Sequence, residues 1–154
     1  MKRVIVVVFK SEPEAFEGSK ALGRLNLEGT IVVNQMVVVH KDRNGRLSTR
    51  EVTDNSSVGA VPATVTGTVV GTLVGALAGP VGALVGGATA GLVGGAVDLG
   101  GFGIRADFVD EVSLSLIPGT TAVIADMVEE WGSPVDKRMT ELGGVVLRRD
   151  LVGV

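Results

Sequence analysis

Few residues of this chain have the types and spacing that nucleotide or cofactor chemistry requires. The stretch 82–89 has the glycine content of a phosphate-binding loop, but it lacks the lysine that would contact the phosphates. Gly101-Phe102-Gly103 lacks both the third glycine of a dinucleotide-binding loop and a strand before it, and is interpreted as an ordinary loop. We therefore predict no cofactor-binding residues.

Metal and acid–base sites are equally hard to assemble. His40 is the only histidine and the chain has no cysteine, so the usual zinc ligand sets are missing, and a solvated position at a strand end is the expected role of His40. The acidic residues cluster on two predicted helical faces that we interpret as solvated surface: Glu12, Glu14 and Glu17, and Asp107, Asp110 and Glu111. We predict no catalytic and no metal-binding residues, and an enzyme is the least supported class.

Glu129-Glu130-Trp131 leaves two alternatives open. These residues could hold a cation or a partner, because carboxylates and an indole both attract positive charge. The favoured interpretation is a turn that leads into a helix, with Trp131 packed on the sheet.

Composition excludes several classes of protein. The chain has 154 residues, of which 45% are hydrophobic, and a mean hydropathy of +0.44, which excludes a disordered protein and predicts a domain with its own core. The formal net charge is −3 and no basic block exists, so nucleic acid is not expected as a partner. With no tyrosine and one tryptophan, a base-stacking platform is not expected either.

The most distinctive pattern is a stretch without charge, from Asn55 to Val97, in which small residues recur every fourth position. This spacing places them in one stripe on a helix, so two such helices could pack closely. The residues predicted to mediate helix packing and oligomerisation are Gly59, Ala63, Gly67, Gly71, Gly75 and Gly79 in the first arm, and Gly82, Gly86, Gly87, Gly91, Gly94 and Gly95 in the second.

The remaining segments predict alternating strands and helices. Hydrophobic runs, turn residues and helix starts predict strands at 4–9, 30–40, 47–53, 120–128 and 145–150, and helices at 12–25, 107–116 and 133–142. The predicted fold is α+β, a ferredoxin-like βαββαβ sandwich with helices on one face of an antiparallel sheet. Residues 1–54 and 99–154 form its two halves, and 55–98 form an inserted glycine-zipper helical hairpin.

Four segments also carry a resemblance to a known family. They are the opening run Met1-Lys2-Arg3-Val4-Ile5-Val6-Val7-Val8-Phe9, the glycine-rich hairpin ending at Asp98-Leu99-Gly100, the helix start Asp107-Phe108-Val109, and Leu116-Ile117-Pro118-Gly119-Thr120-Thr121-Ala122. Over nearly its whole length the chain resembles the bacterial proteins catalogued as domain of unknown function 1269. Those proteins are usually described as predicted membrane proteins because of the hairpin, so the resemblance implies a location more than an activity and no catalytic residues.

The hairpin is compatible with two environments. As helices, Gly59 to Gly79 would span about 30 Å and Val81 to Val97 about 25 Å, against roughly 30 Å of hydrocarbon. Several threonines and the lack of interfacial tryptophan or tyrosine weaken the case for a bilayer. Because an apolar hairpin exposed to water forms too large a patch for a monomer, self-association is expected in either environment.

These observations predict a non-enzymatic structural protein whose partner is itself. In the first alternative the hairpin associates with the cytoplasmic membrane, and the α+β domain faces the cytoplasm. In the second, the protein is a soluble cytoplasmic homo-oligomer such as a shell, ring or filament. A third, weaker alternative is a sensor that binds a small molecule between subunits, by analogy with other ferredoxin-like dimers.

Overall fold

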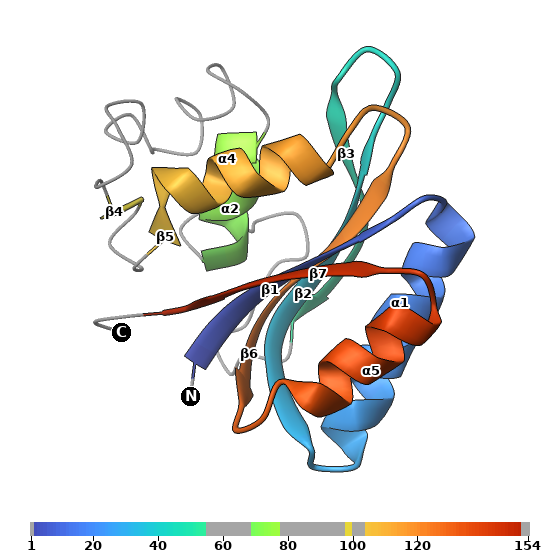
Figure 1. Ribbon diagram of the computed structural model, residues 1–154, viewed down its shortest axis with the longest axis vertical. Helices are drawn as coiled ribbons and strands as arrows, with labels where there is room; N and C mark the ends of the chain where they lie inside the picture. Colours follow the sequence, from blue (N-terminus) through green and yellow to red (C-terminus); the bar gives the residue numbers. More distant parts are fainter. Residues whose placement is uncertain (1, 55–68, 78–97, 100–103, 152–154) are drawn as a thin grey trace.

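The structure is a computed structural model that describes residues 2–54, 69–77, 98–99 and 104–151. Its elements follow one another along the chain as shown in Figure 1. They are β1 (Lys2–Phe9), α1 (Glu12–Leu27), β2 (Ile31–Lys41), β3 (Leu47–Asp54), α2 (Val69–Leu77), β4 (Asp98–Leu99), β5 (Ile104–Arg105), α4 (Ala106–Ser115), β6 (Thr121–Glu129), α5 (Ser133–Glu141) and β7 (Val145–Asp150).

Five of the strands form one sheet in the order β3-β2-β6-β1-β7, and all neighbouring pairs are antiparallel. The first strand along the chain is therefore not at an edge. Val6 of β1 lies opposite Ile124 of β6 on one side and Leu147 of β7 on the other. β4 and β5 form a separate two-stranded sheet. The α+β class and the antiparallel sheet are as the sequence predicts.

Helices cover both faces of the large sheet (Figure 1). On one face α1 and α5 pack against Ile5, Val7 and Phe9 of β1. On the other face α2 and α4 pack against the alternate residues of the same strand: Val4, Val6 and Val8. Successive side chains of a strand point to opposite faces, and here both faces are core, which explains the uninterrupted hydrophobic run of β1. The sequence did not predict that α2 and α4 would form this second layer.

Phe9 determines how closely α1 and the α5–β7 connection approach the sheet. Its buried ring lies against two glycines. A Cβ atom built on Gly18 would stand 2.5 Å from Cζ of Phe9, and one built on Gly144 would stand 2.9 Å from Cε1 of the same ring. Glycine is unfavourable within a helix, and Gly18 is tolerated in α1 because its missing side chain makes room for this ring.

The β2–β3 hairpin turns where the sequence predicts. Gly45 has a φ of +84°, which glycine adopts without strain, and the Asp42 side chain accepts hydrogen bonds from the backbone N–H groups of Asn44 and Arg46, each at 2.9 Å. β3 is an edge strand with mostly polar side chains, as expected for an exposed ribbon.

Candidate functional site

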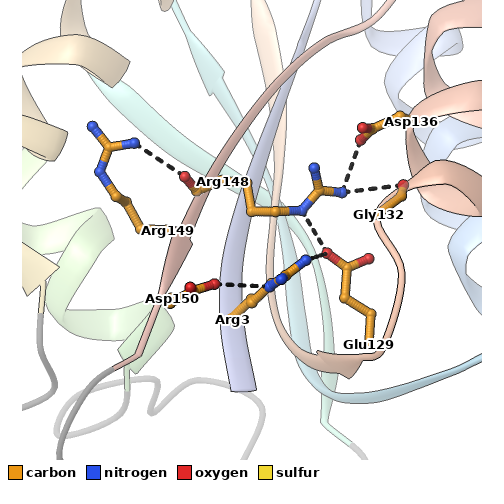
Figure 2. A network of polar contacts seen from close by, with 7 residues as sticks. All are labelled: Arg3, Glu129, Gly132, Asp136, Arg148, Arg149 and Asp150. Carbon is orange, nitrogen blue, oxygen red and sulfur yellow. Dashed lines mark hydrogen bonds and ion pairs between the residues drawn. The ribbon is translucent and has the colours of Figure 1, made fainter. Parts of the chain in front are cut away.

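Charged side chains meet at one end of β1, β6 and β7 (Figure 2). Glu129, the last residue of β6, has a fully buried side chain, and its Oε1 accepts hydrogen bonds from Arg3 Nη1 at 3.1 Å and from Arg148 Nε. Arg3 Nε also donates to Asp150 Oδ1 at 2.8 Å, and Arg148 Nη2 donates to Asp136 Oδ1 at 2.8 Å. We call these five residues the Glu129 network.

The strand order brings these groups together. Arg3 lies directly opposite Asp150 across the β1–β7 pair, while Asp136 comes from the first turn of α5. Arg148 Nη2 also donates to the carbonyl oxygen of Gly132 at 3.4 Å. A Cβ atom built on Gly132 would lie only 3.1 Å from the guanidinium carbon of Arg148. Gly132 thus leaves room for Arg148 under the start of α5.

The carboxylates around Arg148 favour its charged form. Burial by itself lowers the pKa of Arg148, but hydrogen bonds to Asp136 and Glu129 and the negative charges of both carboxylates outweigh it and raise the pKa above its usual range. Glu129 accepts hydrogen bonds from two guanidinium groups of different strands, so its carboxylate is placed to hold these strands together. The network acts as a clamp that joins β1, β6, β7 and α5.

Neighbouring arginines of β7 serve opposite faces of the sheet. Arg148 reaches α5, whereas Arg149 Nη2 donates to Glu111 Oε2 of α4 at 2.6 Å, and its guanidinium lies 5.0 Å from the centre of the Phe108 ring. Figure 2 shows the two side chains leaving the strand on opposite sides. β7 thereby ties both helical layers to the sheet edge, and Glu111 is part of this contact instead of being free solvated surface.

A cleft of about 340 Å³ lies beside the network, where β2 begins and β6 ends. It is lined by residues 29–32 and 128–131, and we call it the Trp131 cleft. Trp131 is 68% exposed and Val32 is 53% exposed. The prediction that Trp131 packs on the sheet is therefore wrong. The space under the end of β6 is taken by the ion pair of Glu129 with Arg148, so the indole remains at the surface.

His40 lies at the opposite end of β2 from the cleft, beside the start of α1. Its Nδ1 is 2.9 Å from Oγ1 of the buried Thr121 and 3.8 Å from Oε1 of Glu12, which also pairs with Arg50 Nε at 2.8 Å. The His40 side chain is 21% exposed, less than a solvated strand end implies. No local pattern could reveal this contact, because it depends on the β2–β6 register that places His40 opposite Thr121.

The part of the chain that the structure describes contains neither a candidate metal site nor a candidate membrane-spanning helix. Within residues 2–54, 69–77, 98–99 and 104–151, no group of three or more histidine and acidic side chains is placed to hold a metal ion. No helix in these same ranges has both the length and the apolar character needed to cross a bilayer.

Comparison with known proteins identifies a family. Residues 64–153 match the family described as "Protein of unknown function (DUF1269)", and they make up more than half of the chain. The chain belongs to the DUF1269 family. No curated protein and no solved structure matches it.

The DUF1269 match begins within the glycine-rich segment and ends just after β7, so it includes α2, α4, β6, α5 and β7. It does not include β1, which lies between β6 and β7 in the sheet. Within the matched region, β6 and β7 are therefore joined through a strand outside it, whereas β4 and β5 pair directly with each other.

Of the glycines predicted to mediate helix packing in this DUF1269 protein, two lie in the described residues. Gly71 and Gly75 belong to α2, where Gly71 is buried and Gly75 is partly buried within the single chain. The other predicted packing residues lie outside the described residues: Gly59, Ala63, Gly67, Gly79, Gly82, Gly86, Gly87, Gly91, Gly94 and Gly95. α2 itself packs on the sheet through buried Val70, Leu73 and Leu77.

Proposed function

We propose that this DUF1269 protein is a non-enzymatic structural protein that self-associates through its charge-free segment 55–97. The observation that carries the proposal is the charge-free stretch 55–97, and its α2 part docks on the large sheet, with Leu73 fully buried and Leu77 7% exposed. This contact attaches the segment to the α+β part, so an assembly formed by the segment carries the α+β part with it. A segment of this length without charge requires an apolar partner surface in water.

We further propose that the α+β part is a ferredoxin-like βαββαβ sandwich with an inserted segment. The order β2-β6-β1-β7 supports this, because β1-α1-β2 and β6-α5-β7 are then the two halves and α1 and α5 share one face. β3 extends this sheet at its edge. The insertion would run from the end of β3 to α4 and supply the helices of the second face.

Two environments fit the proposed self-association. The docking of α2 favours a water-soluble assembly, because Val70, Leu73 and Leu77 are already used within the chain. Association with the cytoplasmic membrane, with the α+β part in the cytoplasm, would require the charge-free segment to present apolar surface to lipid. If residues 59–79 formed one straight membrane helix, α2 would have to leave the sheet and expose Val4, Val6 and Val8.

Fractionation of the untagged protein tests both environments. For the soluble assembly we expect the protein to stay in the supernatant after high-speed centrifugation and to elute, without detergent, as a particle larger than the monomer by light scattering. Sedimentation with membranes and release only by detergent would instead support the membrane arrangement. A monomer in both preparations would contradict self-association itself.

Substitution of Gly91 tests the close packing of the segment. We predict that Gly91→Leu reduces particle size while the thermal transition of the α+β part is unchanged, because a large side chain prevents close helix approach. Gly23→Ala, on α1 with no atom within 4 Å of the added Cβ, is a control for a glycine substitution outside the segment and should leave particle size unchanged. Gly71 is a poorer target because it is buried within its own chain. Unchanged particle size in Gly91→Leu would contradict the packing proposal.

A further inference from the structure

We propose that the Trp131 cleft binds a small organic ammonium ion. The proposal is independent of self-association, because it concerns residues 29–32 and 128–131, at the far end of the sheet from α4 (Figure 1). It follows the alternative that the Glu129-Glu130-Trp131 sequence left open, which was a cation or a partner held at these residues.

The cleft has the size of a small-molecule site. Its volume of about 340 Å³ lies in the range of roughly 300–1,000 Å³ that is typical of such sites. Its walls are the first residues of β2 and the last residues of β6, which are paired by the register of Ile31 with Glu129 and of Val32 with Val128. The walls are thus held in place by the sheet and by the Glu129 network.

Trp131 gives the cleft an exposed aromatic surface. The indole is 68% exposed although a tryptophan buries more apolar area than any other side chain when it packs. The face of an indole is the strongest aromatic binding surface for ammonium groups, and quaternary ammonium ions are recognised in this way. The exposed Val32, also in the lining, adds apolar surface for the methyl or methylene groups of such an ion.

The charges around the cleft favour a cation. Glu130 is exposed beside Trp131, and it takes part in none of the ion pairs among the described residues. In the Glu129 network below it, the guanidinium groups of Arg3 and Arg148 face three carboxylates, those of Glu129, Asp136 and Asp150, so these five groups carry an excess of one negative charge.

Lys2 places a positive charge near the end of β6. Lys2 is opposite Val128, and its charge acts on Asp126, whose pKa it lowers against the effect of burial. The charge of Lys2 thus acts on Asp126, whereas Glu130, on the cleft wall, takes part in none of the ion pairs among the described residues.

Trp131 is the only tryptophan of the chain, so its fluorescence reports on this cleft alone. The full-length protein is titrated with choline chloride, with 3,3-dimethylbutanol as the neutral analogue of the same shape, and with sodium chloride at matched ionic strength. We expect the Trp131 fluorescence to change with choline and to saturate. With the alcohol we expect either no change or a midpoint concentration at least about tenfold higher. An equal response to the alcohol, or a linear response to choline, would overturn the proposal.

Two exposed positions allow tests that do not disturb the core. We expect Glu130→Gln to weaken choline binding about two- to fivefold, the effect of one exposed charge, while the exposed control Glu141→Gln leaves it unchanged. Trp131→Leu, followed by calorimetry, is expected to weaken binding by about two- to fivefold or more. Unchanged binding in both Glu130→Gln and Trp131→Leu would place choline elsewhere and overturn the assignment.

The ammonium group can come from a free metabolite or from a lipid headgroup, and vesicles distinguish these sources. A Trp131 fluorescence change with phosphatidylcholine vesicles, absent with phosphatidylglycerol vesicles and competed by free choline, identifies the headgroup as a source. A response to choline without any response to vesicles identifies a free ligand. An equal response to both vesicles would show lipid contact without ammonium recognition and would contradict the headgroup assignment.

Discussion

At the scale of single residues, the two glycines inside α1 have opposite roles although the sequence makes them look alike. Gly18 leaves space for the Phe9 ring, whereas a Cβ atom on Gly23 would meet nothing within 4 Å. Both weaken the isolated helix, but only Gly18 is required by packing. The sequence predicts that each glycine weakens the helix, and only the tertiary structure shows that Gly18 is needed for packing and Gly23 is not.

We predict opposite effects of alanine at these positions. Gly18→Ala should destabilise the protein by about 1–3 kcal/mol from overpacking, offset only in part by helix propensity, because Phe9 is also confined by Gly144. Gly23→Ala should stabilise it by about 0.5–1 kcal/mol. Urea denaturation of both variants measures the difference. Similar changes at the two sites would show that Phe9 does not pack as described.

The half-buried carboxyl group of Asp126 should make the stability of the protein depend on pH. Burial raises its pKa above the ordinary 3.8, against the charge of Lys2 and a hydrogen bond with Asn34 that lower it, and its buried Oδ1 has no hydrogen-bond partner. With a raised native pKa, the folded state holds this proton more tightly than the unfolded state. The stability linked to Asp126 is therefore highest at low pH and falls as pH rises from about 3.8 through the native pKa.

The pH effect of Asp126 can be measured as the difference in unfolding free energy between the wild type and the Asp126→Asn variant. Asp126→Asn removes this ionisation, so we expect it to raise the free energy of unfolding at pH 7, with a gain that shrinks as the pH is lowered through the native pKa towards 3.8. Urea unfolding of both proteins across this range, taken as a difference, cancels the other carboxylates. A variant less stable than the wild type at pH 7, or a gain that is independent of pH, would contradict this account.

At the scale of elements, α2 shows how a glycine-rich pattern can serve a monomer's own core. Its predicted stripe of small residues suggests contact between helices, but the same nine residues place Val70, Leu73 and Leu77 on one side. These side chains cover the second face of the sheet. Hydrophobic spacing predicts that a helix has an apolar face, and it does not specify whether that face meets a sheet, a second helix or lipid.

Truncation of Leu73 tests the docking of α2. Leu73→Ala should lower the free energy of unfolding by about 2–5 kcal/mol, since the side chain is fully buried. The control Leu114→Ala on α4, 81% exposed, should change it by less than about 0.5 kcal/mol. Chemical denaturation compares the two. If both substitutions are neutral, α2 is not docked on the sheet in solution, and the membrane arrangement gains support.

At the scale of the whole molecule, the strand order makes the two ends of the sequence interdependent. β1 pairs with both β6 and β7, and β2 pairs with β6, so the DUF1269-matched region contains strands that do not touch one another directly. Nonlocal pairing of this kind means that no continuous half of the chain holds the sheet.

This interdependence predicts the behaviour of fragments. A fragment of residues 64–153 should show no cooperative unfolding transition, because β6 and β7 lose the strand between them and the core side chains of β1 on both faces. Adding a fragment of residues 1–54 should restore the transition. Circular dichroism during thermal denaturation measures both. A cooperative transition of 64–153 alone would show that its helices and strands form a core by themselves.

Much of the fold can be predicted from the sequence, because helix starts, turns and hydrophobic runs are local. The nine-residue helix at α5, the Asn44-Gly45 turn and the strands β1, β2, β3, β6 and β7 are found within a few residues of their predicted bounds. The candidate site is different. Arg3, Glu129 and Arg148 look like scattered surface charges in the sequence, and no spacing rule joins residues so far apart.

The sequence by itself determined the α+β class, the antiparallel β2–β3 hairpin and the uncharged segment, since each depends on neighbouring residues. Tertiary structure alone decided which faces are covered, that Glu129 lies between two arginines and that Trp131 stays at the surface. The physical reason is that burial and ion pairing depend on strand order and register. Those are set by the balance of all long-range contacts and not by any one segment.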